Sequence, residues 1–178
     1  MANDFPTTRD MPSRLGKAML IAAWVVGLAL LVLFFQDHLD RDRNPNRDPD
    51  LLVDHAGVPS VVLARNRMGH YVATGSINGA PVTFLLDTGA TTVALPLDLA
   101  RRLELPLLPG GMSKTANGTV RTWSTRLDSV SIAGLSVRNV RAVVMPNMAG
   151  DEVLLGMSYL KRFDLLQRGD TLTLRAPD

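Results

Sequence analysis

The sequence contains no cysteine, only three histidines and few aromatic residues. Without cysteine, the chain can form neither a disulfide framework nor a thiolate nucleophile or thiolate zinc site. The histidines, His38, His55 and His70, lack the spacing of metal ligands, so we expect no metal site and no cofactor. Aromatic residues make up 5% of the chain and the formal net charge is only +2, so we also expect no nucleic-acid partner.

Two further classes of active site have little support in the sequence. There is no G-x-S-x-G nucleophile motif, and the segment SYLK at residues 158–161 lacks the S-D-N and K-T-G companions of the enzymes that use S-x-x-K. The same segment suits a plain amphipathic helix, with Met157, Leu160 and Phe163 facing a core. The segment GGMSKT lacks the Gly-Lys-Ser/Thr ending of a phosphate-binding loop.

One long apolar segment is present, at residues 18–35, and it contains no charge. Its length is at the low end for crossing a bilayer, it is apolar on all sides, and no small-x-small cleavage site follows it. We therefore expect a single-pass helix in the inner (cell) membrane rather than a cleaved signal peptide. The numbers of basic residues on its two sides are equal. Because Arg14 and Lys17 lie next to the span, we expect residues 1–17 to be a short cytoplasmic tail and the remaining chain to be periplasmic.

After the apolar segment, the chain is charged and then becomes β-rich. Residues 36–59 are expected to be a flexible linker, although the apolar part from residue 51 either begins the folded domain or pairs at its edge. Residues 60–178 are long enough for one core and too short for two lobes. They are expected to form an all-β domain with one or two short helices.

Turn signals divide this domain into strands. Asn78-Gly79, Asn117-Gly118 and Ala133-Gly134 predict hairpin turns, and residues 164–174 predict a final hairpin. The segment PLDLARRLEL, which begins at Pro96, and the segment MSYLKRF predict the short helices.

A single carboxylate, Asp87, lies in the apolar segment TFLLDTGATTVALP. A bare D-T-G triplet is weak evidence, but here a buried strand over residues 84–86 leads into it, and Gly89-Ala90 allows a tight turn out of it. A carboxylate at the end of a buried strand, beside small residues, can be reached by backbone groups and water. The alternative is a simple turn in which Asp87 caps its own backbone.

The segment FLLDTGATTVALP resembles the active-site loop of the retropepsin-like aspartic proteases, and further features follow in that family's order. The segment SKTANGTVRTW takes the place of the flap hairpin that closes over substrate, although its expected tip has no tyrosine. The apolar segment ending at Gly156, followed by a short helix, takes the place of the family's apolar-Gly segment. The similarity covers about residues 69–174. With its apolar N-terminal segment, the chain most resembles the single-lobed, membrane-anchored aspartic proteases of bacteria.

This resemblance implies a closed β-barrel or sandwich of the retropepsin (acid protease) type, preceded by a transmembrane helix. The site roles it implies are catalysis by Asp87; support of the active-site loop by Thr88, Gly89 and Ala90; substrate binding under the flap by Ala116, Asn117 and Gly118; and an apolar-Gly segment at Leu154, Leu155 and Gly156. In the resembling family, Thr88 would brace the opposite loop of a second copy and Gly89 would offer its backbone N–H to the carboxylate.

Aspartic-protease chemistry needs two carboxylates about 3 Å apart that share one proton. Because the chain contains one D-T-G, the second Asp87 is expected from a second copy, in a two-fold homodimer. The function expected is that of a membrane-anchored aspartic endopeptidase acting on an extended peptide or protein substrate. The alternatives are a non-catalytic peptide- or partner-binding module on the same fold, and a tethered structural β-domain that would be monomeric with Asp87 exposed.

Overall fold

The computed structural model describes residues 11–115 and 118–177, and the chain divides into two compact units at residue 40. The first unit contains most of α1 (Met11–Arg43), a helix of 33 residues whose side chains from 16 to 36 are exposed. Within the described residues, α1 is the one helix long and apolar enough to cross a membrane, by length and composition. It rises about 50 Å, which exceeds the apolar thickness of a bilayer, and it contains the whole of the expected span 18–35.

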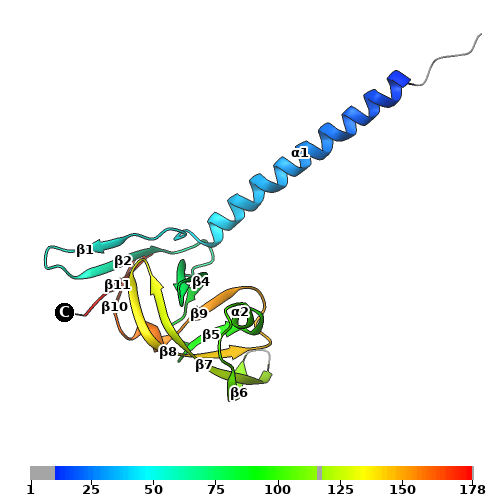
Figure 1. Cartoon of the computed structure of the whole chain (residues 1–178). Helices are drawn as coiled ribbons and strands as arrows, with labels where there is room; N and C mark the ends of the chain where they lie inside the picture. Colours follow the sequence, from blue (N-terminus) through cyan, green and yellow to red (C-terminus); the bar gives the residue numbers. More distant parts are fainter. Residues whose placement is uncertain (1–10, 116–117, 178) are drawn as a thin grey trace, which may run out of the picture. The chain divides into compact units, whose positions relative to one another are not determined.

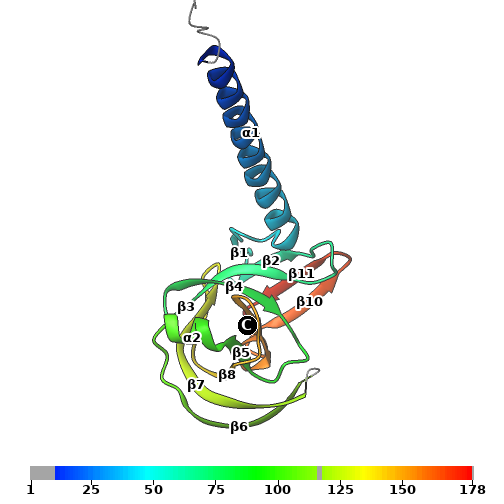
Figure 2. The ribbon, with the colours of Figure 1, turned by 90° about the vertical axis from the view of Figure 1, so that its right-hand side faces the viewer.

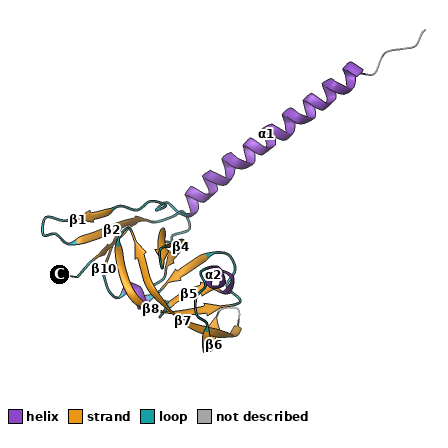
Figure 3. Cartoon of the chain, in the orientation of Figure 1, coloured by secondary structure: helices purple, strands orange, loops and turns teal. Residues whose placement is uncertain are grey.

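The second unit, residues 41–178, is mostly β, as the sequence predicts (Figures 1 and 3). Its elements in chain order are β1 (Leu51–Val53), β2 (Pro59–Ala64), β3 (Val72–Ile77), β4 (Ala80–Leu86), β5 (Val93–Pro96), α2 (Leu97–Arg102), β6 (Leu108–Thr115), β7 (Gly118–Ile132), β8 (Leu135–Met145), β9 (Glu152–Leu155), α3 (Met157–Leu160), β10 (Asp164–Arg168) and β11 (Thr171–Arg175).

The larger sheet closes on itself. Its strand order is β3-β4-β9-β5-β8-β7-β6, and β3 also pairs with β7, so that six of the strands form a ring with β6 attached to β7 (Figure 2). Two predicted hairpin turns are confirmed: Asn78 and Gly79 join β3 to β4, and Ala133 and Gly134 join β7 to β8, all four with positive φ. Paired positive φ values suit the twist of two-residue hairpins.

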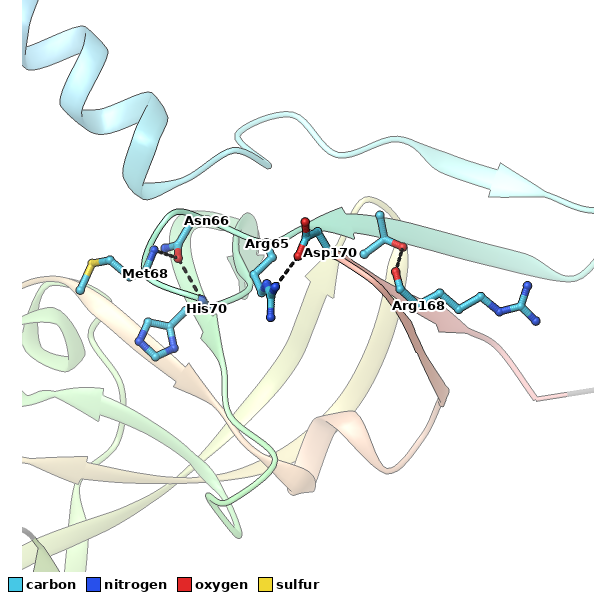
Figure 4. Close-up of polar contacts among 7 residues, drawn as sticks. Arg65, Asn66, Met68, His70, Arg168 and Asp170 are labelled. Carbon is cyan, nitrogen blue, oxygen red and sulfur yellow. Dashed lines mark hydrogen bonds and ion pairs between the residues drawn. The ribbon is translucent and has the colours of Figure 1, made fainter.

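The smaller sheet is antiparallel, with the order β1-β2-β11-β10. It contains the predicted final hairpin, β10–β11, and leaves β10 as one of its two edge strands. Figure 4 shows how the loops at one end of this sheet are held: Arg65 forms an ion pair with Asp170, and the Thr171 hydroxyl donates to the carbonyl of Arg168 over 2.9 Å. Asn66 accepts the backbone N–H groups of Met68 and His70.

Both sheets and both short helices contribute to one apolar core. In α3 and the residues after it, Leu160 is buried and Met157 and Phe163 pack partly against the core, as expected. Tyr159 is buried as well, which the helical pattern had not indicated, and its hydroxyl donates to the carbonyl of Leu135 over 2.7 Å. Burial raises the pKa of Tyr159, so this hydroxyl stays protonated and remains a donor.

The expected flexible linker at residues 36–59 is corrected by the structure. α1 continues through Arg43, and the buried side chain of Asn46 joins two strands: its amide donates to the carbonyls of Ala64 and Val72, and its oxygen accepts the N–H of Ala64. Charge and proline content indicated a mobile chain, but a satisfied buried amide fixes this segment. The compact unit therefore begins at residue 41 rather than 60.

The turn between β1 and β2 is also ordered. Asp54 accepts the backbone N–H groups of Ala56 and Val58, each over 2.9 Å, and forms an ion pair with Arg175 on β11. The hydrogen bond from Val58 is the main cause of a lowered pKa at Asp54. The apolar stretch from residue 51 pairs at the edge of the domain, which was one of its two expected roles. It forms β1, the outer strand next to β2.

Candidate active site

Asp87 lies in the connection between β4 and β5, two strands that do not pair with each other. β9 lies between them, parallel to β4 and antiparallel to β5. Leu86, the last residue of β4, is opposite Leu155, the last residue of β9. Asp87 therefore leaves the sheet at the point where the chain after β9 reaches Gly156.

Three backbone N–H groups fix this connection by hydrogen bonds. The backbone N–H of Asp87 donates to the carbonyl of Leu155 over 3.2 Å, and the N–H of Gly89 donates to Oδ1 of Asp87 over 2.8 Å. The N–H of Ala90 returns to the carbonyl of Asp87 over 3.2 Å, which closes a tight turn. The carboxylate is thus oriented by the backbone, as expected for Gly89, while Asp87 itself stays half-buried rather than fully exposed.

Gly156 is a point of close approach between the two halves of the site. A Cβ atom there would lie 2.4 Å from the carbonyl oxygen of Thr92 and 2.6 Å from that of Ala90. The next residue, Met157, donates its N–H to the Ala90 carbonyl over 2.8 Å. The segment that resembles the family's apolar-Gly element is therefore in direct contact with the Asp87 loop, and Leu154 and Leu155 bring it there as part of β9.

Ser158 has a role that the sequence did not indicate. Its hydroxyl donates to the carbonyl of Arg141 over 2.8 Å and accepts the backbone N–H of Val93 over 3.0 Å. It therefore connects α3 to β8 and to the start of β5, just after the Asp87 loop. The serine of the S-x-x-K segment is therefore not placed as a nucleophile, and its hydroxyl holds strands together.

Thr88 is exposed and lines a cavity of about 250 Å³ beside the smaller sheet. Leu165 and Gln167 of β10 line the same cavity, as does Tyr71, whose buried hydroxyl has no hydrogen-bond partner among the described residues. The structure thus places the exposed side of the Asp87 loop next to an edge strand.

The segment expected to be the flap lies in an antiparallel hairpin of β6 and β7, in which Thr115 is opposite Gly118. Gly118 is the first residue of β7, and the expected tip residues Ala116 and Asn117 lie outside the described residues. Trp123, further along β7, is half-buried against the core.

The chemistry available at this site is that of an oriented carboxylate. Within the described residues, no group of three or more His, Cys, Asp or Glu residues is arranged to hold a metal ion. The backbone-oriented Asp87, with small residues on its C-terminal side, can act as an acid or a base toward water or a bound group.

Comparisons with known proteins agree with this geometry. The family model described as gag-polyprotein putative aspartyl protease matches residues 73–162, about half of the chain. A crystal structure of a retropepsin-like aspartic protease from Rickettsia conorii has a TM-score of 0.60 and 30% sequence identity, over 71% of this chain and 96% of that one.

Two curated relatives are uncharacterised proteins. One, from Sinorhizobium sp., is encoded in the cobV 5′ region and is 34% identical over 131 residues, which are 70% of this chain and 55% of the relative. The other, from Rickettsia prowazekii (strain Madrid E), is 34% identical over 110 residues, which are 60% of this chain and 46% of the relative. The chain spans about half the length of the curated relatives it matches. The family match and the similarity to a retropepsin-like structure agree with the Asp87 loop and the closed β-sheet of this chain. The chain therefore belongs to the retropepsin-like aspartic proteases.

Proposed function

We propose that this protein is a membrane-anchored aspartic endopeptidase, active as a homodimer in which two Asp87 carboxylates activate a water molecule. The observation that carries the proposal is the half-buried Asp87 carboxylate, oriented by the N–H of Gly89 above the end of β9. A simple surface turn would use the same Asp-to-backbone contact. It would not need the close packing of Gly156 against the carbonyls of Ala90 and Thr92.

The reaction follows from the shared proton of such a pair. Two carboxylates about 3 Å apart cannot both ionise, so one is a base and the other an acid at the same time. The base takes a proton from water, which attacks the peptide carbonyl carbon, and the acid protonates the carbonyl oxygen. The tetrahedral species then collapses with proton transfer to the leaving nitrogen, and no covalent enzyme intermediate forms.

A second copy is required because the chain supplies one D-T-G. Of the other aspartates, Asp98, Asp128, Asp151 and Asp164 among them, none is followed by Thr-Gly or Ser-Gly. Thr88 is exposed, so its hydroxyl is accessible to a second copy, which supports its role as the bracing residue across a two-fold axis.

The edge strand β10 is suited to join the two copies. Its free edge carries unpaired backbone groups, and its sequence DLLQR is complementary to itself in antiparallel pairing. With Leu166 on the two-fold axis, Asp164 of one copy lies opposite Arg168 of the other. All three side chains are exposed, and within the described residues Asp164 and Arg168 form no ion pair. Since Leu165 and Gln167 of β10 line the same cavity as Thr88, a seam at β10 would lie close to the Asp87 loop of each copy.

The apolar part of α1 supports the anchor. Its exposed apolar side chains include Trp24, Leu28 and Phe34, and an uncovered apolar helix of this length is typical of a membrane span. We propose that the N-terminus is cytoplasmic and the β-domain periplasmic. Confinement to a membrane would raise the effective concentration of the second copy.

The direct test replaces Asp87 in the full chain, purified in detergent. Asp87→Asn keeps the size and hydrogen-bonding oxygen but removes the acid–base function, so cleavage of an unstructured polypeptide should fall by about 10²–10⁴-fold or more. Asp98→Asn, an exposed carboxylate on α2, is the matched control and should keep full activity. Cleavage by Asp87→Asn at the wild-type rate would overturn the proposal.

Two further measurements separate the proposal from a non-catalytic binding module. Specific activity of the wild type should rise with protein concentration until the dimer saturates, and a statine-type mimic of the tetrahedral species should block it. Wild-type protein that binds peptides without cutting them at any concentration would favour the binding module instead.

A further inference from the structure

Four cationic side chains surround one small cavity on the outside of the β-domain. The cavity has a volume of about 310 Å³, and no carboxylate lines it. Its lining residues are Arg126 on β7, Asn139 and Arg141 on β8, Ser158 on α3, and Lys161 and Arg162 just after α3. We call this cavity the basic pocket.

The two arginines in the sheet are directly opposite each other in the β7–β8 ladder. Residues directly opposite in an antiparallel pair point to the same face, and like charges in that position destabilise the pairing. The sequence nevertheless places Arg126 against Arg141, and it adds Lys161 and Arg162 from a different element. This concentration of positive charge would be relieved by a bound anion.

Among the residues that the structure describes, no acidic side chain forms an ion pair with these four cationic groups. The ion pairs in the described part of the chain involve other arginines, and none includes Arg126, Arg141, Lys161 or Arg162. The nearest carboxylate along the strand, Asp128, also forms no ion pair among the described residues. Arg126 makes a long hydrogen bond, 3.5 Å, to the carbonyl of Asn139.

A second cavity lies beside the basic pocket and is also lined by residues that follow Asp87 in the chain. Its volume is about 360 Å³, and it shares Arg126 and Arg141 with the basic pocket. It is also lined by Thr91 and Thr92, which follow Asp87 by four and five residues, and by Leu108 of the flap strand β6. Its walls are otherwise small and largely apolar. A polypeptide bound along this cavity would lie beside both the residues after Asp87 and the two arginines of the basic pocket. An extended chain therefore fits the arrangement better than a free ion or a lipid headgroup, which would occupy the basic pocket alone.

We propose that the basic pocket binds acidic side chains of a polypeptide substrate, at a distance from the bond that is cut. The inference rests on the proposed function, since it assumes a polypeptide at the Asp87 loop. Arginine is suited to this task because its planar guanidinium donates two parallel hydrogen bonds to one carboxylate. The pocket is open to solvent, so binding should weaken as salt rises.

The test measures binding apart from cleavage. Full-length Asp87→Asn protein in detergent is titrated into two fluorescein-labelled unstructured peptides, one with a block of four glutamates and one with four glutamines. At low salt, anisotropy should give at least tenfold tighter binding of the glutamate peptide. Adding Arg126→Gln and Arg141→Gln should abolish this preference. The charge-matched control, Arg101→Gln with Arg138→Gln, should keep it, because both arginines are exposed and outside the pocket.

Folding is checked in the same variants. Since Arg126 and Arg141 repel each other, their double replacement should leave the Tm unchanged or raise it. A glutamate preference that survives this replacement would overturn the proposal. So would equal binding of both peptides by the parent protein, or pocket-dependent binding of inorganic phosphate or phosphatidylserine vesicles without any peptide preference.

Cleavage by the wild type then separates this inference from the proposed function. If the wild type cuts both peptides equally and the Asp87→Asn protein binds the glutamate and glutamine peptides equally, the protease function stands and the basic pocket has another role. If neither peptide is cut at any concentration but the pocket-dependent preference remains, the acidic-segment site stands and the protease function fails.

Discussion

The α-carbon of Gly156 lies directly against the backbone carbonyl of Thr92, so that a Cβ atom at residue 156 would be 2.4 Å from that oxygen. The contact joins the end of β9 to the connection that carries Asp87. Two residues far apart in the sequence thus determine together where the carboxylate points.

Gly156→Ala should damage both stability and activity. The added methyl must displace the backbone of residues 90–92, and overpacking of this kind typically costs about 1–3 kcal/mol of unfolding free energy. Chemical unfolding followed by near-UV circular dichroism measures the first effect and peptide cleavage the second. The control is Gly111→Ala, where nothing lies within 4 Å of the new Cβ. Equal stability of the two variants would contradict the close packing at Gly156.

Thr88 should act through its hydroxyl in the dimer. Thr88→Val keeps the shape and removes the hydrogen bonds, each worth about 0.5–1.5 kcal/mol, and a two-fold dimer loses them twice. We expect the dissociation constant to rise by about tenfold or more, with little change in monomer stability because Thr88 is exposed. Thr88→Ser keeps the hydroxyl and should stay close to wild type. Sedimentation equilibrium in density-matched detergent measures both, and an unchanged Thr88→Val dimer would remove the bracing role.

The proposed β10 seam predicts a charge-swap rescue. Asp164→Arg and Arg168→Asp each place like charges opposite one another. Each cross-strand charge pair is worth roughly 0.2–1 kcal/mol and the two-fold seam contains two of them, so each single variant should weaken the dimer by about tenfold. The double variant restores opposite charges across the axis and should recover dimerisation and activity. Double and single variants that are equally weak would exclude this register.

Asn46→Ala should destabilise the β-domain. The side chain makes three hydrogen bonds to β2 and β3, one of them buried and two part-buried, and its loss removes these partners from the backbone groups of Ala64 and Val72, at a total cost of about 2–4 kcal/mol. The matched control is Asp48→Ala, at an exposed residue of the same segment. If Asn46→Ala unfolds at the same denaturant concentration as the control, the segment does not stabilise the domain.

Local patterns determined much of this protein. The Asn78-Gly79 and Ala133-Gly134 turns, the strand leading into Asp87 and the apolar helix each follow from a few neighbouring residues, because turn conformation and hydrophobic periodicity are local properties. The D-T-G segment in its apolar context was also sufficient to indicate the family.

Only the tertiary structure decided how distant residues meet. Asn46 lies in a charged, proline-containing segment that indicated a linker, yet strands 18 to 26 residues away supply partners for its amide. Ser158 holds strands together, and Arg126 meets Arg141 through strand register. Gly156 reaches the Asp87 loop because β9 inserts between β4 and β5, an arrangement set by long-range pairing rather than by any local sequence signal.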